Sequence, residues 1–419
     1  MKYLYFLLCF LFSYGCTSVV NEDSQIKGTP ADSDWKCIPK DNLEETESFT
    51  TGEDGKIYDA AGNEFLHRGV NMPVAYYLDE SVNAIPAVAD AGFNSVRLVW
   101  CADNLERAGR CTEKDMHSLQ YLDSYLSALA GNKLVAVLNL QNATGSDDVN
   151  YLNLMVEYLT RDDVKCVLNN HRENLQINIA NEWYGTWVDE VDEKGGYGGN
   201  TWFDGYIDAL DKLRGAGLKH QFIIDTCGWG QDPRCMLEFG DQLLAHDAEL
   251  LIEGDSDDAK LLVSGDSLPK VHSNIVFSAH VYDTLGDPDP EEAHVYDTLG
   301  DPDPEEKGDG GKIYLDSMYE KLKETKLPFI VGEFASTHYG NKVDWLKVIE
   351  EKDNYGLIAW SWFGNSYDLE QLDIIKKMPS TDMAKVQSFS DDGGEPPAPE
   401  YSEFGGNLIN CLFSDCPIE

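Results

Sequence analysis

Two glutamates that lie far apart in the sequence each follow a run of apolar residues. Glu182 lies in INIANEWYG and Glu333 lies in FIVGEFAS, so a buried strand would hold each carboxyl group in place. A pair of carboxyl groups held in fixed positions can hydrolyse a glycosidic bond. A separation of about 5–5.5 Å retains the configuration of the sugar, whereas about 6.5–9.5 Å inverts it. The alternative is that each glutamate is an ordinary strand-end carboxylate, satisfied by arginine or backbone donors.

Arg97 and Asn181 are the polar residues that best suit these two carboxyl groups. Arg97 stands inside an apolar run, where its burial is costly unless it meets a carboxylate, and Glu333 is the predicted partner. Such a pair keeps a nucleophile ionised. Asn181 directly precedes Glu182 and is a candidate partner for a sugar 2-hydroxyl. The alternatives are a structural ion pair elsewhere for Arg97 and a capping role for Asn181.

His280 and Tyr282 are two residues apart, so both side chains face inward if this segment is a strand. We expect Tyr282 to donate a hydrogen bond to Glu333. We expect His280 to bond either the substrate or the acid/base glutamate. A histidine buried and satisfied in the core is the alternative for His280.

The segment that contains this pair is duplicated in tandem. AHVYDTLGDPDPEE at 279–292 recurs without change at 293–306. Only the first copy continues directly from the apolar run NIVFS, so we assign it to the sheet and the second copy to an acidic surface loop. A shifted register would instead place His294 and Tyr296 in the site.

Tryptophans supply flat apolar faces that suit stacking on pyranose rings. Aromatic residues are more often core than platform, and Trp360 is the strongest candidate because it ends the last apolar run. The tryptophans considered are Trp183, Trp187, Trp229, Trp360 and Trp362, of which the last four are predicted to bind substrate.

Eight short apolar runs recur along the chain, and amphipathic segments separate them. This alternation is typical of repeated βα units around a parallel sheet, and eight units close a (β/α)8 TIM barrel. The runs are 65–71, 95–100, 134–140, 175–182, 221–229, 274–282, 328–335 and 356–363. The candidate residues stand at the carboxyl ends of these runs, where such a barrel carries its chemistry. A doubly wound sheet is disfavoured because no glycine-rich phosphate turn follows the first run.

Two of the intervening segments predict helices that end at glycine. They are 81–92, which ends at Gly92, and 206–217, which ends at Gly215 and Gly217. Glycine commonly follows the last helical residue because it adopts the left-handed conformation there at no steric cost.

The composition excludes some partners. The 419 residues include 32 Lys plus Arg and 75 Asp plus Glu, for a net charge of −43. Such a chain repels phosphate backbones and anionic lipid head groups, so nucleic acid is an unsuitable partner. The acidity suits an exported protein that must stay soluble, or one that works in salt.

The first fifteen residues are one apolar run with a single lysine, too short to span a membrane but typical of a signal peptide. We therefore predict a signal at 1–16, an acidic linker at 17–50 and the barrel at 51–419, in a secreted protein. Cys16 resembles the modified cysteine of a bacterial lipoprotein, so a lipid anchor at this residue is one expectation. An ordinary signal cleaved further on is the other. No other apolar stretch suggests a transmembrane segment.

Eight cysteines remain once Cys9 and Cys16 are set aside. An even number in an oxidising compartment favours disulfides, and the spacings match no zinc module. The short-range candidates are Cys101 with Cys111, Cys227 with Cys235 and Cys411 with Cys416, with Cys37 and Cys166 left over.

From about Gly52 to Cys411 the chain resembles glycoside hydrolase family 5, and specifically its bacterial endo-β-1,4-mannanase branch. The segments that carry the resemblance are RGVN (68–71), AIPAVADAGFNSVRLV (84–99), INIANEWYGTW (177–187), DTCGWGQDP (225–233), HVY (280–282), IVGEF (330–334) and LIAWSW (357–362). The resemblance implies a (β/α)8 barrel and a retaining double displacement with Glu182 as acid/base and Glu333 as nucleophile. It also implies that five further residues line the subsite where the bond is cut, namely Arg97, Asn181, His280, Tyr282 and Trp360.

Two positions depart from the pattern of these mannanases. Gln141 and Asn142 stand where His-Asp usually follows the third strand, and Met72 replaces the histidine that commonly follows RGxN. We expect both positions at the rim of the site, with Gln141 binding substrate. Neither change touches the two glutamates, so we expect the chemistry to survive with an altered sugar preference.

The resemblance thus implies a retaining endo-β-1,4-mannanase acting on mannan, galactomannan or glucomannan, and the predicted signal adds that it is secreted. We expect a monomer that needs no metal or organic cofactor. The alternatives are an endo-β-1,4-glucanase on the same barrel and a catalytically silent surface protein that binds polysaccharide.

Overall fold

The computed structural model describes residues 34–41, 48–103, 111–188, 198–254, 273–282, 315–338, 341–365, 373–376 and 399–414. Several predicted features lie outside these residues. They are the signal at 1–16 with the lipid anchor at Cys16, the second copy of the duplication with His294 and Tyr296, and Cys416.

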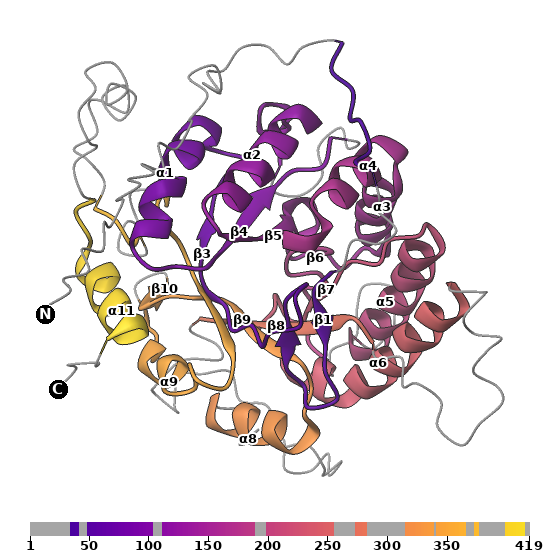
Figure 1. Ribbon diagram of the computed structural model, residues 1–419. Helices are drawn as coiled ribbons and strands as arrows, with labels where there is room; N and C mark the ends of the chain where they lie inside the picture. Colours follow the sequence, from indigo (N-terminus) through magenta and orange to yellow (C-terminus); the bar gives the residue numbers. More distant parts are fainter. Residues whose placement is uncertain are drawn as a thin grey trace, which may run out of the picture.

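Eight parallel strands form a closed barrel, as the eight apolar runs predict (Figure 1). The order around the barrel is β12-β3-β4-β5-β6-β7-β8-β9, so each strand pairs with its neighbour in the sequence and the last pairs with the first. The strands are β3 (Arg68–Met72), β4 (Ser95–Trp100), β5 (Val135–Leu140), β6 (Leu175–Asn178), β7 (Phe222–Asp225), β8 (Ile275–Val281), β9 (Phe329–Phe334) and β12 (Gly356–Ala359).

Helices surround the barrel and cover the outer faces of its strands (Figure 1). The helices are α1 (Leu78–Asp90), α2 (Leu119–Gly131), α3 (Val149–Thr160), α4 (Asp162–Asn170), α5 (Gly198–Gly215), α6 (Arg234–Gly254), α8 (Leu315–Thr325), α9 (Trp345–Glu350) and α11 (Glu403–Phe413). Three short 3-10 helices are η2 (Glu113–Asp115), η3 (Gln141–Ala143) and η4 (Arg172–Asn174). Two small hairpins pair β1 (Thr50–Thr51) with β2 (Ile57–Tyr58) and β10 (Thr337–His338) with β11 (Asn341–Lys342).

Both predicted helices exist, with shifted boundaries. The first is α1, and Gly92 follows it with a φ of 94°. The second is α5, which starts at Gly198 rather than at 206 and includes Gly215, so only Gly217, with a φ of 84°, takes the left-handed conformation. Glycines at 198 and 199 disguise the start of α5 in the sequence. There a Cβ on Gly198 would lie 2.1 Å from the carbonyl oxygen of Trp187, so the close approach requires glycine.

The barrel has one core between strands and helices and a second that its own strands share with the β1–β2 hairpin. The second core contains Phe49, Ile57, Val135, Val137, Ile223, Val276, Ile330 and Ile358. Thr51 Oγ1 donates to the carbonyl oxygen of Ile275, which is the first residue of β8. Asn274 Nδ2 donates to the carbonyl oxygen of Phe49. The hairpin therefore closes the amino-terminal end of the barrel, and the carboxyl end is left for chemistry.

Part of the predicted acidic linker packs against the barrel. Cys37 forms a disulfide with Cys166 of α4, and Lys40 hydrogen-bonds Asn170 at the end of the same helix. Because β1 begins at Thr50, the folded part extends further toward the amino terminus than residue 51.

The short-range disulfides Cys101–Cys111 and Cys227–Cys235 are present as predicted, and the two leftover cysteines pair with each other. Cys411 is also disulfide-bonded. No helix among the described residues is both long enough and apolar enough to cross a membrane.

Candidate active site

The barrel brings Glu182 and Glu333 together at the carboxyl ends of its strands. Glu333 lies in β9, and Glu182 follows β6 by four residues. One carboxyl oxygen of each glutamate and a ring nitrogen of His280 all lie within 4.8 Å of one another. This separation is close to the about 5–5.5 Å of a retaining glycosidase and shorter than the about 6.5–9.5 Å of an inverting one.

The backbone of Glu182 adopts an unusual conformation. Its φ is 46°, in the left-handed region that costs a non-glycine residue about 1–3 kcal/mol. Its N–H donates to Asp225 Oδ2 at 2.9 Å, and its carbonyl oxygen accepts from Gly145 N–H at 3.1 Å. The end of β7 and the loop around Gly145 thus hold the strained residue, and its side chain stays 13% exposed.

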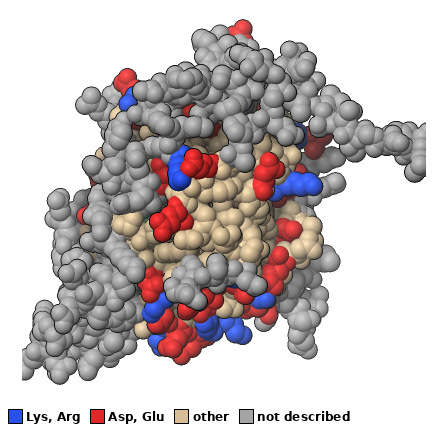
Figure 2. Space-filling view, turned by 90° about the vertical axis from the view of Figure 1, so that its left-hand side faces the viewer, with Lys and Arg blue, Asp and Glu red and all other residues tan. Residues whose placement is uncertain are grey.

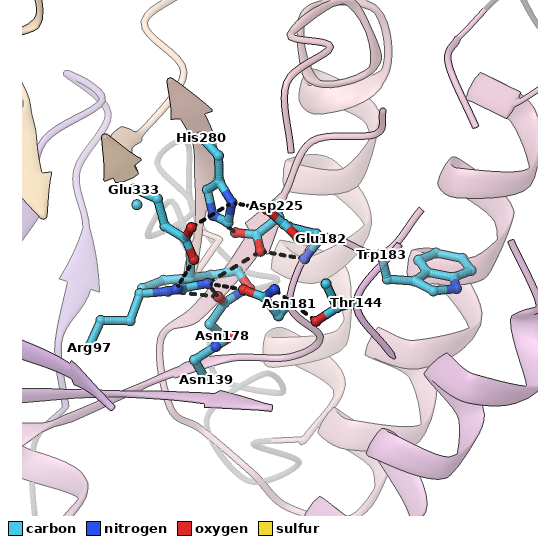
Figure 3. A network of polar contacts seen from close by, with 12 residues as sticks. Arg97, Asn139, Thr144, Asn178, Asn181, Glu182, Trp183, Asp225, His280 and Glu333 are labelled. Atoms are coloured by element: carbon cyan, nitrogen blue, oxygen red, sulfur yellow. Dashed lines mark hydrogen bonds and ion pairs between the residues drawn. The ribbon is translucent and has the colours of Figure 1, made fainter. Parts of the chain in front are cut away.

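Arg97 is the centre of the polar network beneath the two glutamates (Figure 3). The predicted ion pair is present, with Arg97 Nη1 2.6 Å from Glu333 Oε1. The same guanidinium donates to the side-chain oxygens of three asparagines, at distances from 2.6 to 3.2 Å, which are Asn71, Asn178 and Asn181. The side chain of Arg97 is 1% exposed, so its charge is stabilised by these fixed partners rather than by water.

Both ends of the Asn181 side-chain amide bond to other residues of the protein. Its Oδ1 accepts from Arg97, its Nδ2 donates to Thr144 Oγ1 at 2.9 Å, and the residue is 1% exposed. The contact to a sugar hydroxyl stays a prediction for this residue.

Tyr282 and His280 take the positions expected of them. Tyr282 Oη donates to Glu333 Oε2 at 2.7 Å, and His280 Nδ1 lies 2.9 Å from Glu182 Oε1. His280 pairs with Glu333 across the sheet, and a register shift of the β8 strand falls just before it. Such an irregularity re-aims side chains, and it turns both residues of the first duplicated copy into the site.

Asp225 completes the cluster and was not among the predicted site residues. It ends β7, is fully buried, and lies 3.6 Å from His280 Nε2 and 3.6 Å from Arg97 Nη2. The signal in the sequence was an acidic residue at the end of the apolar run FIID, comparable to the glutamate that ends FIVGE.

Charges in this buried cluster shift the pKa values of its members. Burial raises the pKa of Glu182, opposed by the hydrogen bond from His280 and assisted by the negative charge of Glu333. Burial alone would lower the pKa of His280, but Glu333 and Asp225 outweigh it and raise that pKa to about 10. Two cations, Arg97 and His280, therefore face two carboxylates at neutral pH. Ionisation of Glu182 would add an uncompensated third negative charge, so its protonated form is favoured.

Glu182, His280 and Glu333 are also placed so that each offers one ligand atom to a cation. Arg97 Nη1 already occupies a position 2.6 Å from Glu333 Oε1 and would repel a metal ion there. The donor set therefore suits proton transfer better than metal binding.

Trp229 and Trp187 lie on the loop that follows β7 and on the segment after Glu182. Trp229 is 37% exposed, and its ring lies so close to Gly145 that a Cβ there would be 2.0 Å from it. Trp187 is half-buried against Gly228. Because Gly145 also bonds the backbone of Glu182, the exposed ring of Trp229 lies near Glu182.

Trp360 is half-buried, packs against Tyr282 and Ala335, and donates from Nε1 to Asn365 Oδ1. The prediction for Trp362 is wrong, because its side chain is 1% exposed and meets Phe93 edge to face in the core. Trp183 is likewise fully buried and points away from the polar network in Figure 3.

The two departures from the mannanase pattern lie in different surroundings. Gln141 is 8% exposed, and its Oε1 accepts from Asn139 Nδ2 at the end of β5. Asn142 Oδ1 accepts from the backbone of Ala102, which is a structural contact. Met72 is fully buried in the core, so the expectation that it stands at the open rim is wrong.

Comparisons with known proteins identify the family of the chain. The family model of the cellulase family (glycosyl hydrolase family 5) matches residues 58–366. A mannan endo-1,4-beta-mannosidase from Salipaludibacillus agaradhaerens is 31% identical over 320 residues, which cover 76% of this chain and 82% of that protein.

A solved beta-mannanase from Thermomonospora fusca is 23% identical and superposes with a TM-score of 0.61 over 87% of this chain and 94% of its own. The mannotriose complex of that enzyme superposes with the same score at 22% identity, covering 88% of this chain and 98% of its own. At these identities the two structures show the shared fold. The matched family model spans the whole barrel with both glutamates, and the chain belongs to glycosyl hydrolase family 5.

Proposed function

We propose that the protein is a retaining endo-β-1,4-mannanase in which Glu333 is the nucleophile and Glu182 the acid/base. The observation that carries the chemistry is the approach of the two carboxyl groups to within 4.8 Å. A retaining double displacement requires about 5–5.5 Å between them, whereas an inverting enzyme requires a wider gap for water.

In the first step Glu333 attacks the anomeric carbon. Arg97 and Tyr282 each donate to a different oxygen of its carboxylate, which fixes the direction of attack. As the glycosidic bond breaks, protonated Glu182 gives its proton to the leaving oxygen. His280 donates to Glu182 Oε1 and so leaves the other oxygen to face the leaving group.

In the second step water hydrolyses the glycosyl-enzyme. Glu182 is now a carboxylate and takes a proton from the attacking water, while the imidazolium of His280 stabilises the negative charge that Glu182 carries between the two steps. The C–O bond to Glu333 breaks, and both carboxyl groups return to their starting protonation states.

The relative from Salipaludibacillus agaradhaerens supports mannan as the substrate, because it is named for this activity and matches 76% of this chain at 31% identity. An exposed tryptophan beside the acid/base, Trp229, supports polysaccharide binding in general. A silent binding protein would need neither the paired carboxyl groups nor the buried donors that orient them.

The test compares Glu182→Gln and Glu333→Gln with the wild type on mannan. We expect each change to lower kcat by at least about 100-fold, because each removes a proton donor or a nucleophile. Glu324→Gln, on the surface of α8, is the control and should act as the wild type does. If either active-site variant kept more than a few per cent of the activity, the assigned roles would be wrong.

The substrate and the stereochemistry need separate measurements. Galactomannan, glucomannan and carboxymethyl cellulose are compared in parallel, and greater activity on carboxymethyl cellulose would favour an endoglucanase instead. The first product seen by proton NMR on manno-oligosaccharides should be the β-anomer, since retention follows from the short carboxyl separation. Early release of the α-anomer would contradict the double displacement.

The proposal includes export, with residues 1–16 as the signal and Cys16 as a site for lipid attachment. It is supported by the apolar run at the amino terminus and by three disulfides within the described residues. Fractionation of producing cells tests it: the protein should leave the cytoplasm, and Cys16→Ser should release it from the envelope if the cysteine carries a lipid.

A further inference from the structure

Asp225 is the one acidic residue of the buried cluster that the double displacement does not use. It ends β7, on the strand next to β6, and its side chain is fully buried. A buried carboxylate is costly unless it acts on fixed partners, so its contacts indicate what it does.

The first contact is to the backbone of the acid/base. Asp225 Oδ2 accepts the N–H of Glu182 at 2.9 Å, at the residue whose φ of 46° is unusual for glutamate. The bond joins the end of β7 to the turn after β6, and it therefore sets where the side chain of Glu182 starts. A change of this turn would move the carboxyl group relative to the glycosidic oxygen.

The second contact is to the ring that faces the acid/base. Asp225 Oδ1 lies 3.6 Å from His280 Nε2, and neither atom has a partner within hydrogen-bond distance in the described part of the chain. The opposite ring nitrogen, Nδ1, lies 2.9 Å from Glu182 Oε1. A carboxylate on the Nε2 side attracts the protonated ring and favours a proton on both nitrogens.

The remaining charges around His280 do not replace this role. Glu333 Oε2 lies 3.7 Å from Nδ1, on the same side of the ring as Glu182, and Tyr282 donates to Glu333 rather than to the histidine. Arg97 Nη2 lies 3.6 Å from Asp225 Oδ2 and helps to hold the carboxylate in place. Among the described residues, Asp225 is the one acidic residue that contacts both the backbone N–H of Glu182 and the Nε2 side of His280.

We propose that Asp225 is a positioning residue for the acid/base: one oxygen holds the backbone of Glu182 and the other holds the ring of His280 that faces the carboxyl group of Glu182. This rests on the proposed role of Glu182 as the acid. Figure 3 shows Asp225 beside both Glu182 and His280.

The test uses two substrates that differ in their need for an acid. Cleavage of mannohexaose requires a proton on the leaving oxygen, whereas the phenolate of 2,4-dinitrophenyl β-mannobioside leaves without one. If Asp225 acts through Glu182, Asp225→Asn should lower kcat/KM on mannohexaose at least about tenfold more than on the aryl substrate. Asp225→Ser gives the same comparison with a smaller side chain if the amide variant does not fold.

Glu182→Gln calibrates the test, because it removes the acid outright and should show the same preference for the aryl substrate more strongly. Asp247→Asn is the matched control: Asp247 is also fully buried, pairs with Arg214 and accepts the N–H of Asn274, but lies on α6 away from the site. The kcat/KM of Asp247→Asn should either stay unchanged or fall by the same factor on the two substrates.

An equal loss on both substrates for the Asp225 variants, with the calibrating preference present in Glu182→Gln, would overturn the inference and leave the proposed function intact. Failure of the wild type to cleave mannohexaose, or absence of the preference in Glu182→Gln, would instead overturn the proposed function.

Discussion

The charge of each side chain in the active site depends on the groups that it faces. Glu182 and Glu333 are chemically identical, yet Arg97 and Tyr282 donate to one and His280 to the other. The two glutamates thereby acquire different roles. Two cations balance two of the three buried carboxyl groups, and the third is left to carry a transferable proton.

Replacement of His280 by glutamine tests this balance through the pH profile. His280 lowers the pKa of Glu182 both by its hydrogen bond and by its charge, although burial still raises that pKa overall. Without the imidazolium the pKa of Glu182 rises further, so Glu182 keeps its proton to higher pH. We therefore expect the alkaline limb of the kcat/KM profile to move to higher pH in His280→Gln.

Tyr282→Phe is the control for this experiment. The pKa of Tyr282 is raised by its burial and by Glu333, so its hydroxyl keeps its proton across the range in which Glu182 titrates. The phenylalanine variant should lose activity without moving the alkaline limb. A limb that moves to lower pH in His280→Gln would contradict the assigned charges.

Trp229 and Trp362 were both predicted to bind substrate, but replacement by alanine should affect them differently. Trp229 is exposed near Glu182, so Trp229→Ala should raise KM on mannan by about two- to tenfold and leave the melting temperature unchanged. Trp362 is in the core, so Trp362→Ala should lower the free energy of unfolding by about 3–5 kcal/mol. Steady-state kinetics and thermal melts on both variants check this, and an unchanged KM for Trp229→Ala would remove its role as a platform.

At the scale of elements, adjacent strands deliver the reacting groups from residues distant in the chain. The pairing of β8 with β9 sets His280 against Glu333, and the shift of register before His280 lets both His280 and Tyr282 reach the site. The loop after β7 contributes from the other side, because the carbonyl oxygen of Gly230 accepts the N–H of His280 at 2.7 Å. A Cβ on Gly230 would lie 3.0 Å from the ring, so this packing requires glycine.

The disulfide between Cys37 and Cys166 should matter for stability and not for catalysis. It closes a loop with a sequence separation of 129 and ties the amino-terminal segment to α4, away from the carboxyl ends of the strands. Removing both cysteines with serine should cost about 2–4 kcal/mol, because the unfolded chain regains the freedom that the bond removes.

Calorimetry and kinetics below the melting temperature check this prediction. The melting temperature of Cys37→Ser/Cys166→Ser should fall while kcat and KM stay as in the wild type. The contrasting pair is Cys101 with Cys111, which packs against Trp360 and should affect activity when removed. Loss of activity in the folded Cys37/Cys166 variant would show that the amino-terminal segment influences the active site.

At the scale of the whole molecule the excess of negative charge is the dominant property. The net charge is −43. On the face shown in Figure 2, acidic side chains surround an area of uncharged residues, and several lie beside a basic one. Exposed ion pairs among the described residues, such as Lys347 with Asp316, offset only a small part of the repulsion, since such pairs contribute little.

Salt should therefore stabilise the fold. Sodium chloride screens charges beyond about 10 Å at 0.1 M and about 3 Å at 1 M, so self-repulsion weakens as salt rises. We expect the melting temperature to increase from low to molar sodium chloride and to increase less in a sucrose solution of equal osmolality. A melting temperature that is flat or falls with salt would contradict an adaptation to brine.

Much of the fold was predictable because each barrel strand is a local pattern. Runs such as SVRLVW and FIVGEF are buried on both faces, and a continuous apolar run is therefore visible in the sequence itself. Partners of opposite charge inside such runs were also predictable, as with Arg97 and Glu333, since an unpaired buried charge is too costly to persist.

The tertiary structure alone decided which side chains reach substrate and which lie in the core. Trp360 and Trp362 are two residues apart near the end of one strand, and only their packing separates a half-buried ring beside Tyr282 from one enclosed by Phe93. Asp225 gained its role in the same way, because its partners come from β6 and β8. The physical reason is that periodicity along a chain specifies the exposure of one element, whereas contacts between side chains depend on the register and closure of the whole barrel.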